Sequence, residues 1–146
     1  MLFYLVAIFV ISVDQITKYL IRIHVDIGEF ITVWGMRFTH YENSGMAGSH
    51  LQGYGRLFGV VALLFVVFVF YYRRTNKLQG ILLNCSLGLF VGGAIGNGVD
   101  RLLFGQVTDF IIRSGGILNV ADHAIELGVL FFLLHMVIGW LKNRKA

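Results

Sequence analysis

Charged side chains are scarce in this 146-residue chain, and their scarcity excludes an ordinary soluble domain. Only 14% of the residues are charged and 57% are hydrophobic, whereas a typical soluble domain carries about 25% charged residues. The mean hydropathy is +0.76. The chain has no proline and a single cysteine, Cys85, so an internal disulfide cannot form. These features predict an integral membrane protein with one domain, residues 1–146.

The few basic residues are concentrated at two places. One cluster lies in residues 73–77 and the other in residues 142–145, and none of the eight acids lies in either cluster. Short loops rich in Lys and Arg stay in the cytoplasm. The distribution therefore predicts that the 73–77 loop and the C-terminus are cytoplasmic. It also explains the net charge of +4 without a nucleic-acid partner, and we expect none.

Long apolar runs are abundant. Four of them, at about residues 1–23, 54–72, 78–99 and 121–141, approach the roughly 20 residues that cross a bilayer as a helix. Four spans with a cytoplasmic C-terminus also place the N-terminus in the cytoplasm. The first run lacks the basic start and the small-residue cleavage site of a secretory signal, so we expect a retained helix.

Two more polar regions share the outer side. Residues 30–34 and 36–41 are β-prone runs separated by Gly35, within an outer region of about residues 24–53. Residues 100–119 form a shorter stretch punctuated by glycine. The predicted fold is therefore mainly α and membrane-embedded, with four transmembrane helices and a small β-sheet cradle on the outer face.

Small residues recur at every fourth position of the third apolar segment. The series is Gly80, Asn84, Gly88, Gly92 and Gly96. This spacing lets helix backbones approach closely in lipid, so it predicts helix packing. Asn97, Asp100 and Arg101 follow within one turn at the outer end, where they can pair with neighbours at the membrane interface.

Asp14 and Lys18 are four residues apart in the outer half of the first segment, so they share one helix face. Two interpretations stay open for this pair. It is either a buried ion pair that stabilises the helix bundle or a direct contact with a substrate.

Asp109 and Asp122 lie beside boundaries between polar and apolar sequence. A carboxylate at a membrane boundary costs free energy, which indicates a function. The two acids meet only if the outer region folds back, across the turn at residues 114–116, over the start of the fourth helix. Asn119 is in position to be an N-cap with Asp122 at N3. Capping by Asp122 and a turn role for Asp109 are therefore the alternatives to chemistry.

If the two carboxyl groups converge, they share one proton, because both cannot easily ionise at close range. One then activates water as a base and the other protonates the carbonyl oxygen of the scissile bond. A helix N-terminus favours an anion by about 0.3–1 kcal/mol, so our hypothesis is that Asp122 is ionised and Asp109 carries the proton. The chain has no His-Glu-x-x-His zinc motif and no Gly-x-Ser-x-Gly elbow.

Five motifs occur in order along nearly the whole chain. They are Asp14-Gln15-Ile16-Thr17-Lys18, Asn43-Ser44-Gly45-Met46-Ala47, Gly92-Gly93-Ala94-Ile95-Gly96-Asn97-Gly98-Val99-Asp100-Arg101, Val107-Thr108-Asp109-Phe110 and Asn119-Val120-Ala121-Asp122. Together with the four spans, they resemble the lipoprotein signal peptidase family, the type II signal peptidases of bacteria. Each motif alone is weak evidence, but all five in this order are specific.

The resemblance implies a membrane aspartic endopeptidase of the bacterial cytoplasmic membrane. Such an enzyme removes the signal peptide of a diacylglyceryl-modified prolipoprotein just before the lipidated Cys, at the outer face, with no metal and no cofactor. It implies that Asp109 and Asp122 are catalytic. Other residues would bind substrate or shape the site: Asp14, Lys18, Asn43, Gly45, Asn97, Asp100, Arg101, Asn119 and Ala121. The implied partners are the prolipoprotein, membrane lipid and a globomycin-type inhibitor, and we expect a monomer.

The chain departs from the family pattern at a few positions. Gly48 and Leu118 stand where Phe is usual, His123 stands where Ser is usual, and the Pro common near the last motif is missing. These changes predict altered lipid preference, inhibitor affinity or pH dependence. Two other functions stay open: a non-catalytic homologue that binds lipidated proteins, and a small proton-coupled transporter. The transporter is disfavoured because the acids lie near one face and no inverted repeat is visible.

Overall fold

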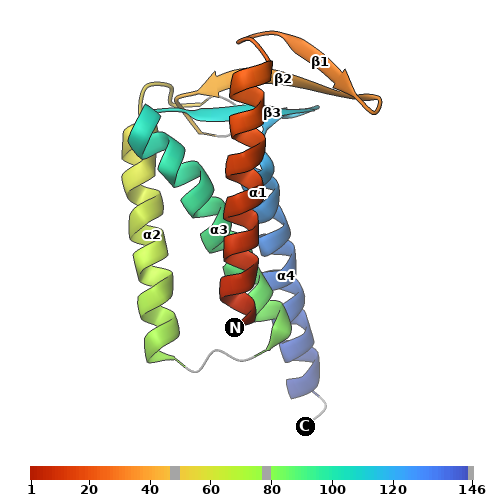
Figure 1. Cartoon of the computed structure of the whole chain (residues 1–146). Helices are drawn as coiled ribbons and strands as arrows, with labels where there is room; N and C mark the ends of the chain where they lie inside the picture. Colours follow the sequence, from red (N-terminus) through yellow and green to blue (C-terminus); the bar gives the residue numbers. More distant parts are fainter. Residues whose placement is uncertain (47–49, 77–79, 145–146) are drawn as a thin grey trace.

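Four long helices make up most of the computed structural model, which describes residues 1–46, 50–76 and 80–144 (Figure 1). They are α1 (Leu2–His24), α2 (Gly55–Thr75), α3 (Ile81–Phe104) and α4 (Val120–Asn143). Each is long and apolar enough to cross a membrane, which confirms the predicted four-span fold. Lys77 and Lys145 of the basic clusters, Ala47 of the second motif and Gly48 after it lie outside the described residues.

The third helix continues past the predicted end near Val99 and stops at Phe104. Gly105 ends it, with a φ of 76° and its amide bonded to the carbonyl oxygen of Arg101. A left-handed glycine is a common way to stop a helix. The prediction ended too early because Asp100 and Arg101 resembled the start of a polar loop. Both instead lie in the last two turns of α3.

α3 contacts the other three helices, and its glycines allow the close approach. A Cβ atom added at Gly92 would lie 2.7 Å from Cβ of Val10 in α1, and one at Gly93 would lie 2.6 Å from the carbonyl oxygen of Ala121 in α4. Both distances are shorter than real Cβ contacts, so larger residues would push the helices apart. The predicted packing role is confirmed for Gly92, and Gly93 adds a second close contact.

The helices expose apolar side chains outwards. Leu64 and Phe68 of α2 and Leu133 of α4 are 63%, 60% and 53% exposed. Because helices satisfy their own backbone hydrogen bonds, such a surface is stable in lipid. The outward faces of α1, α2 and α4 are therefore the lipid-facing surface of the protein.

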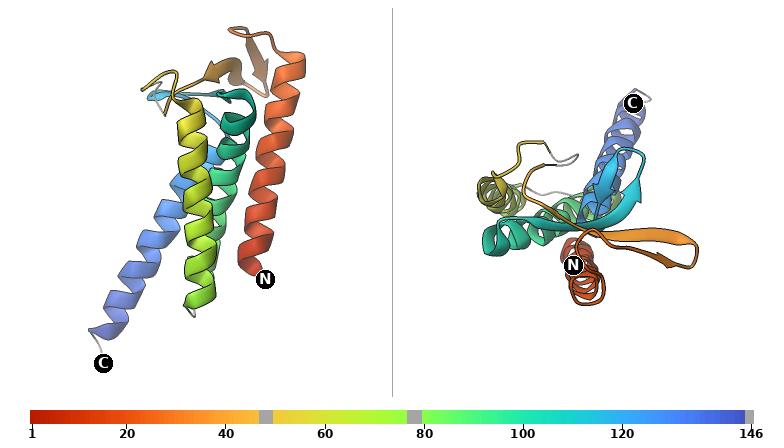
Figure 2. Two further views of the ribbon diagram at one scale, coloured as in Figure 1. Left: turned by 90° about the vertical axis from the view of Figure 1, so that its left-hand side faces the viewer. Right: turned by 90° about the horizontal axis from the view of Figure 1, so that it is seen from above.

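A four-stranded antiparallel sheet lies at the end of the bundle where α1 stops (Figures 1 and 2). Its strands are β1 (Phe30–Val33), β2 (Met36–Asn43), β3 (Val107–Arg113) and β4 (Gly116–Leu118), in the order β1-β2-β3-β4. The two predicted β-prone runs pair with each other, which confirms that part of the cradle. The expectation for residues 100–119 was incomplete, because they supply β3 and β4 rather than only a loop.

The register of β2 against β3 places Asp109. Tyr41 lies opposite Asp109 and Asn43 opposite Val107, and an irregularity between Phe38 and Tyr41 shifts the pairing. Below the sheet, Phe110 packs against Ile21 and Val25 at the end of α1. This contact holds β3 across the helix ends, so Asp109 faces the start of α4.

Candidate active site

Asp109 and Asp122 meet through one buried side chain, that of Asn119. The Asn119 Nδ2 donates to Asp109 Oδ1 at 2.6 Å, and Asn119 Oδ1 accepts from the backbone amide of Asp122 at 3.0 Å. The side chain of Asn119 is fully buried. The fold-back that the sequence required is therefore present, and the hairpin of β3 and β4 provides it.

Asp122 uses its two carboxylate oxygens differently. Oδ2 accepts from the backbone amide of Asn119 at 3.2 Å and completes a capping box at the start of α4. Oδ1 accepts from Asn97 Nδ2 at 2.8 Å and faces the site. The capping interpretation is thus correct for one oxygen and leaves the other available. These donors and the N-terminus of α4 favour the ionised carboxylate.

Asp109 is only 2% exposed, and it accepts hydrogen bonds from Asn43 at 2.9 Å and from Asn119 at 2.6 Å. Burial away from water raises the pKa of Asp109 to about 7, the negative charge of Asp122 adds to the rise, and the two hydrogen bonds oppose it. A carboxyl group with a pKa of about 7 can hold or release a proton at neutral pH.

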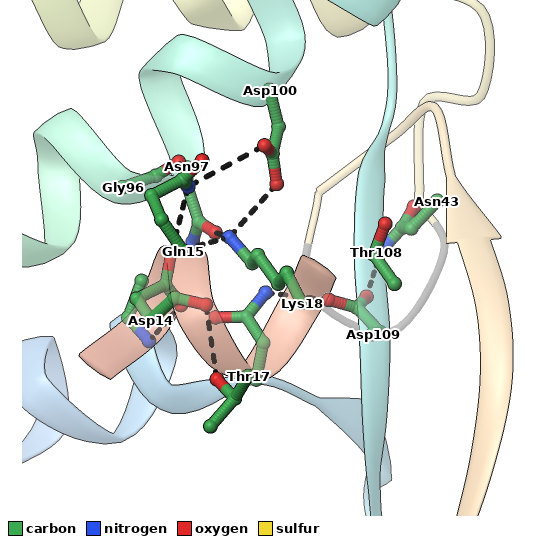
Figure 3. Close-up of polar contacts among 12 residues, drawn as sticks. Asp14, Gln15, Thr17, Lys18, Asn43, Gly96, Asn97, Asp100, Thr108 and Asp109 are labelled. Carbon is green, nitrogen blue, oxygen red and sulfur yellow. Dashed lines mark hydrogen bonds and ion pairs between the residues drawn. The ribbon is translucent and has the colours of Figure 1, made fainter. Parts of the chain in front are cut away.

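A fully buried lysine, Lys18, lies among polar side chains of α1 and α3 (Figure 3). Lys18 Nζ is 2.7 Å from Asp14 Oδ2, 3.0 Å from Asp100 Oδ2 and 2.8 Å from Asn97 Oδ1. The ammonium donates a hydrogen bond to Asn97 and forms ion pairs with Asp14 and Asp100. A buried cation without a partner is costly. Here two buried carboxylates neutralise the charge of Lys18.

Lys18 also fixes the orientation of Asn97. The amide oxygen of Asn97 accepts from Lys18, so its nitrogen points to Asp122 Oδ1. If a carboxylate were the only neighbour, it would orient the amide nitrogen of the asparagine and leave the amide oxygen without a partner. Here the lysine holds the acceptor end as well, and Asn97 delivers a donor to Asp122.

The second oxygen of Asp14 anchors the last helix. Asp14 Oδ1 accepts from the backbone amide of Ala121 at 2.8 Å, and both residues are fully buried. Since neither Asp14 nor Lys18 has an exposed surface, the geometry supports the ion-pair interpretation over direct substrate contact. The pair joins α1 to the start of α4, beside Asp122.

Sequence reasoning missed a second polar connection, from α1 to the sheet. Arg22 Nη2 lies 3.0 Å from Asp100 Oδ1, and Arg22 Nε donates to Thr108 Oγ1 at 2.7 Å. Thr108 in turn donates to Glu42 Oε1 at 2.7 Å. Arg22 follows Lys18 by four residues, so the helical spacing that singled out Asp14 and Lys18 was a signal for it.

Arg101 ties the chain after β2 to α3. Its Nη2 donates to the carbonyl oxygen of Gly45 at 3.1 Å, and the Gly45 amide donates to Asn43 Oδ1 at 2.9 Å. A Cβ at Gly45 would collide with the carbonyl oxygen of His50. Asn43 therefore contacts both this turn and Asp109, and Arg101 lies within electrostatic reach of both site carboxyl groups.

A largely apolar cavity of about 490 Å³ lies beside Asp122, between α2, α3 and α4. Asp122, Asn97 and Arg101 line its polar end, and Phe65 and Phe90 are among the apolar residues along its walls. A site of this shape accepts a largely apolar ligand with one polar segment. Within residues 1–46, 50–76 and 80–144, no cluster of three His, Cys, Asp or Glu side chains is arranged to hold a metal ion.

Two of the departures from the family pattern lie next to the acids. Nδ1 of His123 lies 2.8 Å from the carbonyl oxygen of Asn119, so this nitrogen carries the proton. Leu118 is the last residue of β4 and is partly buried. Gly48 lies outside the described residues.

Comparison with known proteins shows the family of this chain. The chain matches the family model described as signal peptidase (SPase) II over residues 6–138. The lipoprotein signal peptidase of Shouchella clausii is 40% identical, over 98% of this chain and 97% of the relative. That of Bacillus velezensis is 35% identical over 99% of both.

Solved structures agree as well. Two structures of bacterial membrane enzymes, each 29% identical, match with TM-scores of 0.83 and 0.80. The first match covers 91% of this chain and 85% of the other, and the second covers 90% of both. The chain therefore belongs to the signal peptidase II family.

Proposed function

We propose that the chain is a membrane aspartic endopeptidase that cleaves the signal peptide from prolipoproteins, at the bond before a diacylglyceryl-modified cysteine. The observation that carries the proposal is the pair Asp109 and Asp122, which Asn119 joins, with Asp122 at the polar end of an apolar cavity. Membership in an aspartic peptidase family supports the same reaction. A non-catalytic binding protein would not need the intact pair, and a transporter would not need an acid pair gathered at one end of the bundle.

In the first step, the ionised Asp122 takes a proton from a water molecule, and the water oxygen bonds to the carbonyl carbon before the lipidated cysteine. Asp109 gives its proton to the carbonyl oxygen, so the intermediate is a neutral geminal diol. Asp109 suits this role because its pKa of about 7 keeps much of it protonated at neutral pH.

In the second step, the carbon–nitrogen bond breaks and Asp122 returns its proton to the amine of the lipidated cysteine. Asp109 takes back a proton as the diol becomes the carboxyl terminus of the released signal peptide. Both acids then regain their starting forms. The pair titrates as a unit, so the pH profile of cleavage reports the pair.

The remaining site residues hold the pair. Asn43 and Asn119 bond Asp109, and Asn97 bonds Asp122. Asp14, Lys18 and Asp100 fix Asn97 and the start of α4 from behind. Arg101 holds the turn at Gly45 and faces the cavity, where its charge suits a substrate carbonyl oxygen. Ala121 provides a backbone amide rather than a side chain.

The site would lie at the outer face of the bacterial cytoplasmic membrane, with both termini in the cytoplasm. Basic residues support this orientation. Arg73 and Arg74 end α2, and Lys142 and Arg144 lie at the end of α4, which is the end opposite the sheet (Figure 1). Basic flanks favour the cytoplasmic side.

A lipidated substrate would enter the cavity sideways from the bilayer, because the cavity walls from α2, α3 and α4 are apolar. A globomycin-type inhibitor would occupy the same space. All polar residues of the site come from one chain, so a monomer suffices.

Mass spectrometry of a purified, diacylglyceryl-modified prolipoprotein tests the proposal. We expect the wild-type enzyme to release the signal peptide, and we expect no cleavage by Asp109→Asn or Asp122→Asn. Asp26→Asn is the matched control, because Asp26 is an exposed acid outside the site, and it should cleave normally. Cleavage that survives a change at either site acid would remove that residue from catalysis. A substrate without the diacylglyceryl group tests the lipid requirement.

A further inference from the structure

The hairpin of β1 and β2 extends sideways beyond the helix bundle. Seen from above, it reaches past α1, while β3 and β4 stay over the other helices (Figure 2, right). The side chains at its tip are exposed: 41% for Val33, 94% for Trp34 and 57% for Met36. A soluble protein rarely gathers such residues without a partner.

The two faces of the hairpin differ in polarity. Ile31 and Phe38 lie opposite each other across the strands, and both pack against the apolar cluster at the end of α1. Side chains alternate between the faces of a strand, so the next pair on this face is Val33 and Met36. These two extend the apolar face beyond the bundle.

The opposite face is more polar. It carries Thr32 and Arg37, which lie directly opposite each other. The guanidinium of Arg37 lies 5.0 Å from the ring centre of Phe30 on the same face. The hairpin therefore has an apolar face that continues the core and a face that holds a cation towards water.

Trp34 has an unusual backbone conformation for its type. It precedes Gly35 in a two-residue turn, and the φ angles of the two residues are 50° and 79°. A turn with two positive φ angles favours Asn-Gly, and a bulky side chain at the first position is strained. Since Trp34 is 94% exposed, packing within the chain does not offset that strain. A contact outside the chain would.

We propose that the β1–β2 hairpin is a membrane anchor, with Val33, Trp34 and Met36 inserted into the boundary between the lipid headgroups and the acyl chains. The apolar surface leading there is continuous. Tyr19 and Ile23 on α1 are 60% and 52% exposed, and they lead towards the hairpin. Tryptophan is enriched at this depth of a membrane because its ring is apolar and its N–H is polar.

The anchor acts on the sheet that carries Asp109. β2 pairs with β1 at one edge and with β3 at the other, so lipid contact at the tip restrains the strand next to Asp109. The inference requires only that the chain crosses a membrane. It does not depend on proteolysis or on which side the sheet faces.

Tryptophan fluorescence tests the anchor. The chain has two tryptophans, so Trp140→Phe leaves Trp34 as the sole emitter in the full chain. We reconstitute this variant in phosphatidylcholine–phosphatidylglycerol vesicles. We expect blue-shifted emission and strong quenching by lipids brominated near the headgroup. Quenching should be weaker with bromine near the chain end and weakest with iodide in the water. Emission of a hydrated indole, quenched best by iodide, would overturn the anchor.

A matched control moves the indole to the other face. Thr32→Trp, combined with Trp34→Asn and Trp140→Phe, places the sole tryptophan beside Arg37. We expect this indole to be quenched by iodide more than by brominated lipid. The same lipid quenching at both positions would overturn the assignment of the two faces.

Trp34→Asn separates the effect of lipid contact from the effect of the side chain on folding stability. Asparagine followed by glycine suits the turn, so the melting temperature in detergent should not fall. In vesicles, however, amide hydrogen exchange in β1 and the start of β2 should accelerate relative to the wild type. Unchanged exchange in vesicles would contradict the anchor. Prolipoprotein cleavage is a separate measurement, so its loss with intact lipid quenching counts against the proposed function alone.

Discussion

Two pairs of aspartates lie near one end of this bundle, and their partners differ in kind. Asp14 and Asp100 share the ammonium of Lys18, and Asp100 also contacts Arg22. The hydrogen bonds described for the carboxyl groups of Asp109 and Asp122 come instead from amide groups, those of Asn43, Asn97 and Asn119. A cation fixes a carboxylate in its charged form, whereas a neutral amide orients it and leaves its proton exchangeable. The first pair therefore suits structure and the second suits chemistry.

The largest effect should follow from removing the exchangeable proton. We expect Asp109→Asn to lower kcat by at least roughly 10³-fold, because general acid catalysis is lost. Single-turnover cleavage of a prolipoprotein measures this change. The variant should remain folded, because asparagine keeps the size of the side chain, and its melting temperature checks that. If Asp109→Asn were active, Asp109 would not be catalytic, and the two pairs would no longer differ in function.

Removing the shared cation should act on stability. Lys18→Met leaves Asp14 and Asp100 buried without their main partner, and we expect a loss of about 3–5 kcal/mol in the free energy of unfolding. Denaturant titration in mixed micelles measures it. The double variant Lys18→Met/Asp14→Asn should recover part of the loss. Without recovery, Asp14 is not the partner that the lysine neutralises.

The pH dependence should show which form of Asp109 works. Its pKa is raised to about 7 and the reaction needs its protonated form, so kcat/KM should fall as pH rises through about 7. The Asn43 hydrogen bond lowers that pKa, so Asn43→Ala should move the alkaline limb to higher pH. A pH series of initial rates measures both profiles. Activity that instead rises as pH increases through about 7 would mean that Asp109 acts as the base.

The same pKa has a consequence for stability. The folded protein holds the Asp109 proton more tightly than the unfolded chain, whose carboxyl titrates near 3.8. The contribution of this group is therefore present at low pH and is lost as pH rises through about 7. Asp109→Asn should remove this pH dependence. Melting temperatures of wild type and variant over the same pH range provide the test.

The smallest effect should come from an exposed ion pair. Arg113 Nη1 lies 2.7 Å from Glu126 Oε2, but the two side chains are 49% and 53% exposed. We expect Glu126→Gln to change stability by less than about 1 kcal/mol and to leave cleavage unchanged. A large loss of activity would show that Glu126 contacts the substrate, contrary to its position outside the cavity.

The sequence predicted the elements whose signal is local. Four apolar runs predicted the spans, and the β-prone residues around Gly35 predicted the first hairpin. β3 was missed because it pairs with β2, which lies far away in the chain. The length of α3 was underestimated because the sequence does not show that Lys18 and Arg22 neutralise Asp100.

The site was predicted only in part, because some of its contacts are local in the sequence and others join distant elements. Helical spacing was enough to pair Asp14 with Lys18, and capping rules were enough to place Asp122 at the start of α4. The meeting of Asp109 with Asp122 depended on a tertiary fold-back, which no local pattern specifies. The orientation of Asn97 depends on two elements distant in the chain. It is therefore visible only in the three-dimensional structure.

Asn119 couples the assembly of the acid pair to the formation of the last helix. The residue that starts α4 is also the residue that joins the two acids, so neither arrangement exists without the other. On the proposed mechanism, a nascent chain whose last span has not yet inserted would lack the assembled pair and would not cut its neighbours in the membrane. Hydrolysis would then begin only with the completed bundle.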